Sequence, residues 1–196
     1  LRTACELLGD LGARNSITGE LTATGKAMSE LPMHPRLARL VLESASRGAM
    51  ELGVFAAAVL TERSAMTNRI NQETRDGEPV SDFLALAQVF YAARQSEFDE
   101  NVCARFNLQA SAARRIERTY HYFINLCMRN FSLPVSSHEN SSIGFAQAML
   151  LAYPDHLARR IDKGTLMCEM REKRRGGLSS QSCVRQAPLL VAAEIR

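Results

Sequence analysis

Apolar side chains recur every three or four residues along most of the chain, which is the spacing of one face of an α-helix. The longest such stripe lies within residues 116–131, where Ile116, Tyr120 and Phe123 fall on one side. The pattern therefore predicts a largely helical protein. Shorter stretches that we expect to be helical cover residues 1–13, 34–48, 50–63, 82–94 and 142–161, the last with a break near Pro154.

Turn and capping residues divide the first part of the chain. Thr22 is suited to cap the helix that follows it, because its side-chain oxygen can accept from a backbone N–H two or three residues on. Pro32 and Pro35 are expected to end that helix and to start the next, and Gly48 to follow the C-terminus of the latter. His34, at the start of that second helix, is interpreted as a capping or packing residue.

The pattern changes after Gly164, where apolar residues come in short runs. Residues 164–172, 182–186 and 188–196 have strand-like character, and a turn is predicted over 175–180. Exposed loops are predicted over 68–79 and 132–141. We therefore expect a mainly α fold with a small β element at its end.

The composition is that of an ordinary globular protein, with 196 residues of which 46% are hydrophobic and 23% charged. The longest apolar run, residues 54–60, is far shorter than the roughly 20 residues of a membrane-spanning helix. The five cysteines are odd in number and far apart, which argues against a disulfide framework and favours a reducing, cytoplasmic setting. A first residue other than Met, within a helical pattern, is typical of a piece of a longer protein.

The sequence contains no phosphate-binding G-x-x-x-x-G-K-[ST] loop, no G-x-G-x-x-G fingerprint and no G-x-S-x-G nucleophile turn. The scattered cysteines and histidines predict no metal site. A Cys–His nucleophile pair stays open, since such pairs meet in space rather than in sequence. Cys103 and Cys127 lie in apolar helical patterns, which favours a buried packing role for both.

Positive charge is concentrated in the second half. Residues 1–98 hold 10 Lys and Arg against 12 Asp and Glu, whereas residues 99–196 hold 14 against 9. Seven of these basic residues fall between Arg159 and Arg175. A basic patch of this kind points to nucleic acid.

A series of motifs runs through residues 7–45 and returns near the end of the chain. It comprises Leu7-Leu8, Leu11-Gly12-Ala13, Gly19-x-Leu21-Thr22-x-x-Gly25, Met28, Leu31-Pro32-x-His34-Pro35-Arg36-Leu37-Ala38, Tyr153-Pro154-Asp155 and Leu157-Ala158-Arg159-Arg160. The stretch over residues 7–45 resembles the helicase-associated region that follows the motor domains of DEAH/RHA-type ATP-dependent RNA helicases. The match continues in order through residues 82–90 and 102–123, and the tail is similar to the bacterial HrpB-type branch.

The resemblance implies a winged-helix remnant over residues 1–48, a ratchet-like helical bundle over 49–153 and the start of an incomplete OB-like β domain over 154–196. It implies that the region closes an RNA channel beside RecA-like motor domains upstream in the same chain. ATP and Mg²⁺ would then belong to those motor domains, and the region itself would hold no cofactor and catalyse no reaction. For Arg36 and Arg39 we favour a structural role, such as packing against the motor domains.

Four residues of the long predicted helix share the face opposite its apolar stripe: Arg115, Arg118, Tyr122 and Arg129. A basic face with one aromatic side chain suits a groove that tracks the phosphates of single-stranded RNA. The alternative is an ordinary solvated helix surface.

A second candidate group follows the Tyr153-Pro154-Asp155 element. OB-folds bind oligonucleotides with their strands and loops, so we expect basic residues there to contact RNA, with a solubilising loop as the alternative. The group comprises Arg159, Arg160, Arg171, Lys173, Arg174 and Arg175.

Two other classes of function stay open at this stage. The first is a protein-interaction adaptor that docks a partner and never binds nucleic acid. The second is an independent cysteine-dependent enzyme, which requires Cys and His within hydrogen-bond reach.

Overall fold

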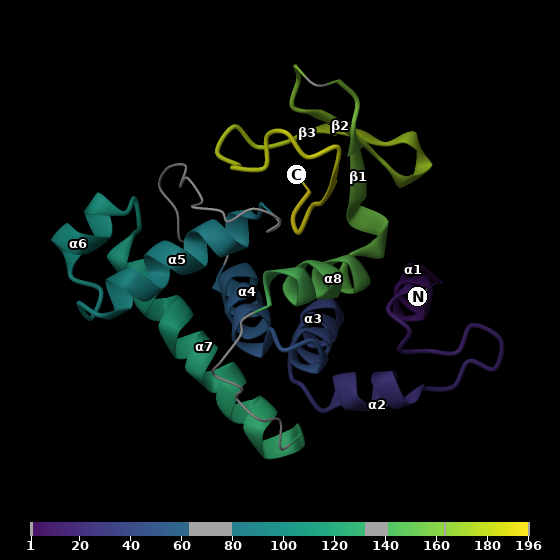
Figure 1. Cartoon of the computed structure of the whole chain (residues 1–196). Coiled ribbons are helices and arrows are strands. Elements are labelled where there is room, and N and C mark those ends of the chain that lie inside the picture. The colour runs from purple at the N-terminus through teal and green to yellow at the C-terminus, as the bar shows by residue number, and fades with distance from the viewer. Residues whose placement is uncertain (1, 63–79, 132–140, 163, 196) are drawn as a thin grey trace.

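The computed structural model describes residues 2–62, 80–131, 141–162 and 164–195, and it shows a mainly helical chain that ends in a small antiparallel sheet (Figure 1). This confirms the predicted fold class. The predicted loop over 68–79, most of that over 132–141, and Lys163 lie outside the described residues. The helices are α1 (Arg2–Asp10), α2 (Ala23–Ser29), α3 (Pro35–Ser46), α4 (Met50–Glu62), α5 (Asp82–Arg94), α6 (Glu100–Arg105), α7 (Ala110–Phe131) and α8 (Ser142–Ala152).

The core lies around α4, which packs against α3 on one side and α7 on the other. Almost every residue of α4 from Met50 to Ala58 is buried, as expected for a helix that is apolar on all sides. Gly53 permits the close contact with α3, because a Cβ at this position would lie 2.4 Å from Oγ of Ser44. α3 in turn packs against α8.

The predicted caps of α2 and α3 are confirmed. The Thr22 hydroxyl accepts from the backbone N–H of Gly25 (3.0 Å) and donates to the carbonyl of Gly12 (2.6 Å). His34 Nδ1 accepts from the N–H of Arg36 (3.3 Å), which requires that this ring nitrogen be unprotonated. Burial, together with the charge of Arg36, lowers the pKa of His34 and so favours this capping form. Gly48 follows α3 with a positive φ of 67°.

The long helix α7 buries the predicted stripe, including Ile116, Tyr120, Phe123 and Cys127. It begins at Ala110, six residues before the first residue of that stripe. The extra turns are buried through small alanines, which give only a weak hydrophobic pattern in the sequence.

The C-terminal sheet has four antiparallel strands in the order β3-β2-β1-β4. β1 pairs with both β2 and β4, so that Arg159 stands opposite Glu169 on one side and Leu189 on the other. The strands are β1 (Leu157–Arg160), β2 (Met167–Met170), β3 (Arg175–Gly177) and β4 (Leu189–Val191).

Three local predictions at this end of the chain are wrong. Residues 157–160 were expected to be helical, but α8 ends at Ala152 and these residues form the central strand β1. Residues 175–177 form β3 instead of a turn, and residues 182–186 form no strand. In each case the outcome depends on pairing with distant segments, which local periodicity does not report.

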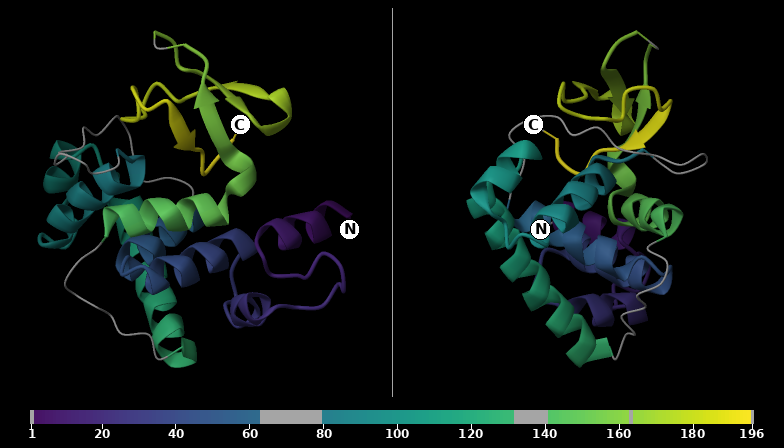
Figure 2. Two further views of the ribbon diagram at one scale, coloured as in Figure 1. Left: turned by 45° about the vertical axis from the view of Figure 1, so that its right-hand side comes forward. Right: turned by 60° about the vertical axis from the view of Figure 1, so that its left-hand side comes forward.

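Figure 2 shows from two further sides that the sheet lies at one end of the helical body, where α8 leads into it. Their joint is built by Arg36 of α3, whose guanidinium donates twice to the carboxylate of Asp155 (both 2.7 Å) and once to the carbonyl of Ala152 (3.1 Å). The same guanidinium lies 5.1 Å from the ring centroid of Tyr153. The two segments that carry the family resemblance therefore meet here, and Arg36 has a structural role within this chain. The division into the three predicted domains stays a prediction.

The joint predicts how stability responds to acid. Hydrogen bonds from Arg36 hold the pKa of Asp155 below its usual value, so the folded state keeps this carboxylate charged at a pH where the unfolded chain protonates it. Its contribution is complete above the unfolded pKa of about 4 and is lost as the pH falls through the lower folded pKa. Urea unfolding between pH 6 and pH 2 is expected to show a weaker acid dependence in Asp155→Asn than in the parent chain.

The matched control is Asp10→Asn at the exposed end of α1, which is expected to follow the parent curve. Identical acid dependence in the parent chain and in Asp155→Asn would contradict the account of this joint.

Candidate nucleic-acid interface

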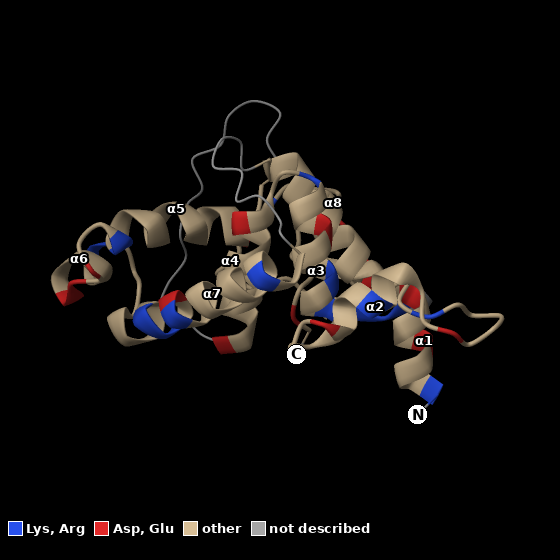
Figure 3. Cartoon of the chain, turned by 90° about the horizontal axis from the view of Figure 1, so that it is seen from below, with Lys and Arg blue, Asp and Glu red and all other residues tan. Residues whose placement is uncertain are grey.

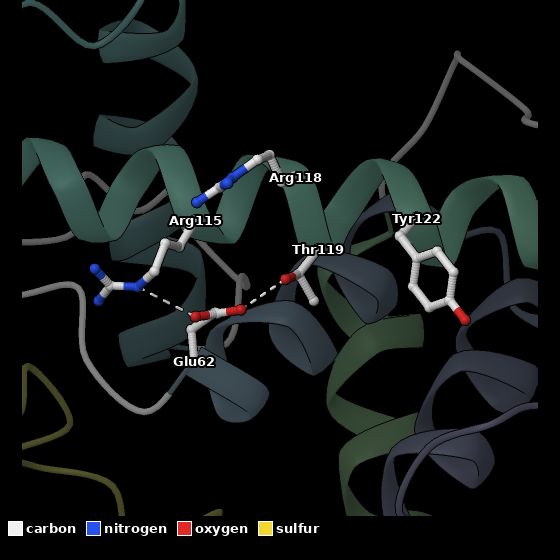
Figure 4. Close-up of a pocket in the computed structure, with 5 residues that line it drawn as sticks. All are labelled: Glu62, Arg115, Arg118, Thr119 and Tyr122. Carbon is white, nitrogen blue, oxygen red and sulfur yellow. Dashed lines mark hydrogen bonds and ion pairs between the residues drawn. The ribbon is translucent and has the colours of Figure 1, made fainter.

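A shallow hollow of about 270 Å³ lies on the outer face of α7, where it meets the end of α4 (Figure 4). It contains three of the four residues predicted on this helix face. The side chains that line it are Glu62, Arg115, Arg118, Thr119 and Tyr122.

A carboxylate stands at the centre of this hollow. Glu62, the last residue of α4, receives a hydrogen bond on Oε1 from the Thr119 hydroxyl (2.7 Å), and its Oε2 lies 3.3 Å from Nε of Arg115. The carboxylate is largely buried, whereas the Arg115 side chain is 43% exposed. Arg115 is therefore partly neutralised and still reachable from solvent.

Arg118 and Tyr122 are exposed on the same helix. Arg118 makes no ion pair with the described residues. Tyr122 is 54% exposed and projects to the same side of α7 as Arg115 and Thr119 (Figure 4). The hollow thus contains two arginines, one of which pairs with Glu62, and a flat aromatic ring. These are groups of the kind that bind phosphates and bases of a single strand.

Arg129 is exposed and lies two turns further along α7, outside the hollow. Its position seven residues after Tyr122 places it about 10 Å along the helix axis. Figure 3 shows that basic and acidic segments of α7 lie close together. The acidic residue of α7 is Glu117, which pairs with Arg94 of α5 (2.7 Å).

The basic residues of the sheet form a second group. Arg159 lies 3.1 Å from Glu169 and Arg175 lies 3.7 Å from the same carboxylate, across three adjacent strands. Both arginine side chains remain mostly exposed, at 70% and 66%. The other exposed members, in or next to the short 3-10 helix η2 (Arg171–Lys173), are Arg171, Lys173 and Arg174.

The expectation that Arg160 binds RNA needs correction. Arg160 is only 8% exposed, and its guanidinium donates to three backbone carbonyls, at 2.9–3.1 Å. It points inward because side chains alternate along β1, with Arg159 outward and Arg160 inward. Its donors are used within the fold, so it is withdrawn from the candidate interface. The carbonyls belong to Thr165, Val184 and Ala187.

The structure does not bring the two candidate groups together. α7 lies at one end of the helical body, whereas the sheet lies beyond α8, and the views from different sides agree (Figures 1 and 2). The α7 hollow is the more developed site, since it combines cations, a hydroxyl and an aromatic ring in one place.

Other kinds of chemistry find little support among the described residues. No group of His, Cys, Asp and Glu in the described ranges is arranged to hold a metal ion. Burial raises the pKa of Cys127 to about 11, and it also raises that of Cys103. Both thiols are therefore poor nucleophiles, as their helical pattern suggested. In the part of the chain that the structure describes, no helix has the length and apolarity needed to cross a bilayer; the cytoplasmic setting stays a prediction.

Sequence reasoning missed Glu62 and Thr119. Thr119 follows Arg115 by one helical turn and is a neighbour that the helical period could have indicated. Glu62 lies 53 residues before Arg115, and only the packing of α4 on α7 brings the two together.

The chain is similar in sequence to known proteins of one class. No family model matches the chain. The chain is 26% identical over 149 residues to the "Pre-mRNA-splicing factor ATP-dependent RNA helicase prp22" of Schizosaccharomyces pombe, a match that covers 72% of this chain. It is also 26% identical over 176 residues to the "ATP-dependent RNA helicase HrpA homolog" of Haemophilus influenzae, a match that covers 80% of it.

In each case the match spans only 13% of the relative's own length. Both relatives are RNA helicases of the type that the sequence motifs predicted, whereas the finer assignment to the HrpB-type branch stays a prediction. The chain is therefore similar to one segment of two ATP-dependent RNA helicases.

Proposed function

We propose that this chain is an accessory, C-terminal region of an ATP-dependent RNA helicase, which closes the RNA channel and helps the motor domains to hold single-stranded RNA during translocation. Its two helicase relatives support the class of protein. The observation that carries the proposal is the α7 hollow, whose lining includes Arg118, Arg115 and Tyr122.

The chemistry of the hollow fits a single strand of any sequence. Arg118 and Arg115 attract phosphates, which every nucleotide carries, and Tyr122 offers a ring on which any base can stack. Arg129 extends the same face toward the next phosphates. The exposed cations of the sheet, Arg159 and Arg175, provide a second contact region under this proposal.

The proposal assigns ATP, Mg²⁺ and the hydrolytic chemistry to RecA-like motor domains elsewhere in the same protein. The sequence of this chain has no phosphate-binding loop, and its match covers a small part of each relative. The chain then contributes only binding and geometry, and its partners are single-stranded RNA and the motor domains.

Stacking on Tyr122 gives the first test. Tyr122→Ala is expected to weaken binding of a fluorescently labelled oligouridylate by about tenfold, because a base stacked on an aromatic ring contributes about 1–3 kcal/mol. Tyr122→Phe keeps the ring and is the matched control, with affinity expected within twofold of the parent. Fluorescence anisotropy at low salt measures both.

Equal affinity in the parent chain, Tyr122→Ala and Tyr122→Phe would contradict the stacking role. Failure of the parent chain to bind RNA at any salt concentration would favour the protein-interaction adaptor instead.

A further inference from the structure

The lining of the α7 hollow includes a negatively charged side chain, that of Glu62. Glu62 lies among the groups that the proposed function assigns to RNA, and its Oε2 faces Nε of Arg115 at 3.3 Å. Its side chain is only 22% exposed, so the carboxylate is part of the lining and not a passing surface contact. A phosphate that binds Arg115 therefore meets a carboxylate already in place.

A carboxylate and a phosphodiester are equivalent partners for a guanidinium, since both offer anionic oxygens that accept its N–H groups. When both approach Arg115, they also repel one another, and this repulsion is weakly screened in a partly buried site. Arg118 has no comparable partner among the described residues. Among the described residues, Arg115 is thus the arginine of the hollow for which phosphate meets a competing carboxylate.

A hydrogen bond from Thr119 is the second interaction of the Glu62 carboxylate. The Thr119 hydroxyl donates to Oε1 of Glu62 at 2.7 Å, whereas Arg115 faces the other oxygen, Oε2. When Arg115 turns toward a phosphate, the bond to Thr119 keeps Glu62 in the hollow. The ion pair between Glu62 and Arg115 can then form again when the phosphate leaves.

We propose that Glu62 competes with the RNA phosphate for Arg115. This competition keeps the binding of RNA to this face weak and readily reversible. The proposal rests on the proposed function, because it concerns how the same hollow binds a single strand. A region that holds RNA while motor domains step along it has to release each phosphate repeatedly. Competition by Glu62 supplies that release without any change of fold.

The test is the variant Glu62→Gln, which keeps the length of the side chain and an oxygen for Thr119 but removes the charge. Binding of labelled oligouridylate is expected to tighten about fivefold at low salt. The plot of log K against log salt is expected to steepen by about 0.7, the value for one more neutralised phosphate on a single strand. The matched control is Glu100→Gln on the exposed surface of α6. The affinity of this variant for RNA is expected to stay within about 1.5-fold of the parent's.

A double-mutant cycle separates competition at Arg115 from a general effect of charge. In the Arg115→Ala background, Glu62→Gln is expected to raise the RNA affinity by less than about twofold, since the cation for which Glu62 and phosphate compete is absent. Glu62→Asp keeps the charge but shortens the reach toward Arg115, and a gain smaller than that of Glu62→Gln is expected. Thermal unfolding followed by circular dichroism checks that each variant is folded.

An unchanged or weaker affinity of Glu62→Gln, an equal gain in Glu100→Gln, or a full gain in the Arg115→Ala background would each overturn the competitor role. A different result would contradict the proposed function, namely an RNA affinity that is unchanged when Arg118 or Tyr122 is replaced by alanine. The two failures are therefore distinguishable in one set of titrations.

Discussion

Arg160→Lys is expected to destabilise the chain by about 3 kcal/mol, because one ammonium cannot replace a guanidinium that donates to three separate carbonyls. The three bonds hold the carbonyls of Thr165, Val184 and Ala187 around the inner face of β1. With lysine, at least one of these carbonyls loses its partner in a nearly buried site, and the planar group that fills the space is gone. Urea unfolding at neutral pH measures the loss.

The neighbour Arg159 provides a matched control. Its side chain is 70% exposed and pairs only with Glu169 across the strand, so Arg159→Lys is expected to change the free energy of unfolding by less than about 0.5 kcal/mol. Equal stability of the two variants would return Arg160 to the candidate interface.

Gly25→Ala is expected to be the second severe change, although alanine normally stabilises a helix by about 1 kcal/mol relative to glycine. A Cβ on Gly25 would lie 2.0 Å from the carbonyl oxygen of Ala13. That carbonyl cannot retreat easily, because it accepts from the N–H of Thr22 (3.0 Å) and its residue is bonded through its own N–H to Leu8 (2.8 Å). We expect a loss of about 3 kcal/mol from this overpacking.

The measurement for Gly25→Ala is the thermal midpoint, expected to fall by about 6–12 °C for a chain of this size. Gly164→Ala is the control, since a Cβ there meets no atom within 4 Å, and its midpoint is expected to stay within about 2 °C. A parent-like midpoint for Gly25→Ala would contradict the close contact between α2 and the turn at Ala13. It would also remove the structural reason for Gly25 in the stretch Gly19-x-Leu21-Thr22-x-x-Gly25.

The sequence was sufficient to predict the elements whose signal is local. The stripe of α7, the hydroxyl cap at Thr22 and the proline start of α3 each depend on residues within a turn or two of one another. Strands β2 and β4 lie within stretches that were predicted to be strand-like. Strands β1 and β3 were missed, because they are three or four residues long and are defined by partners elsewhere in the chain. Residues 157–160 show the consequence, since a helical interpretation hides the alternation that separates Arg159 from Arg160.

The candidate site was predicted to a similar extent. One helix face was enough to select Arg115, Arg118 and Tyr122, because all three project from a single regular element. The sequence could not indicate that Arg115 is shared with Glu62, since that contact arises from the packing of α4 against α7. Tertiary packing thus decided which predicted cations are available and which are already engaged.

We propose that this chain binds single-stranded RNA through the outer face of α7. The most direct measurement is the salt dependence of oligouridylate binding in the parent chain and in the double variant Arg118→Ala/Arg129→Ala. With about four phosphates neutralised, log K in the parent is expected to fall with log salt at a slope of roughly −3, and the double variant is expected to reduce that slope by about 1.4. Arg2→Ala on α1, which removes an exposed positive charge elsewhere, is expected to leave the slope unchanged. An affinity that does not depend on salt, or a slope that is the same in the parent and the double variant, would contradict the claim.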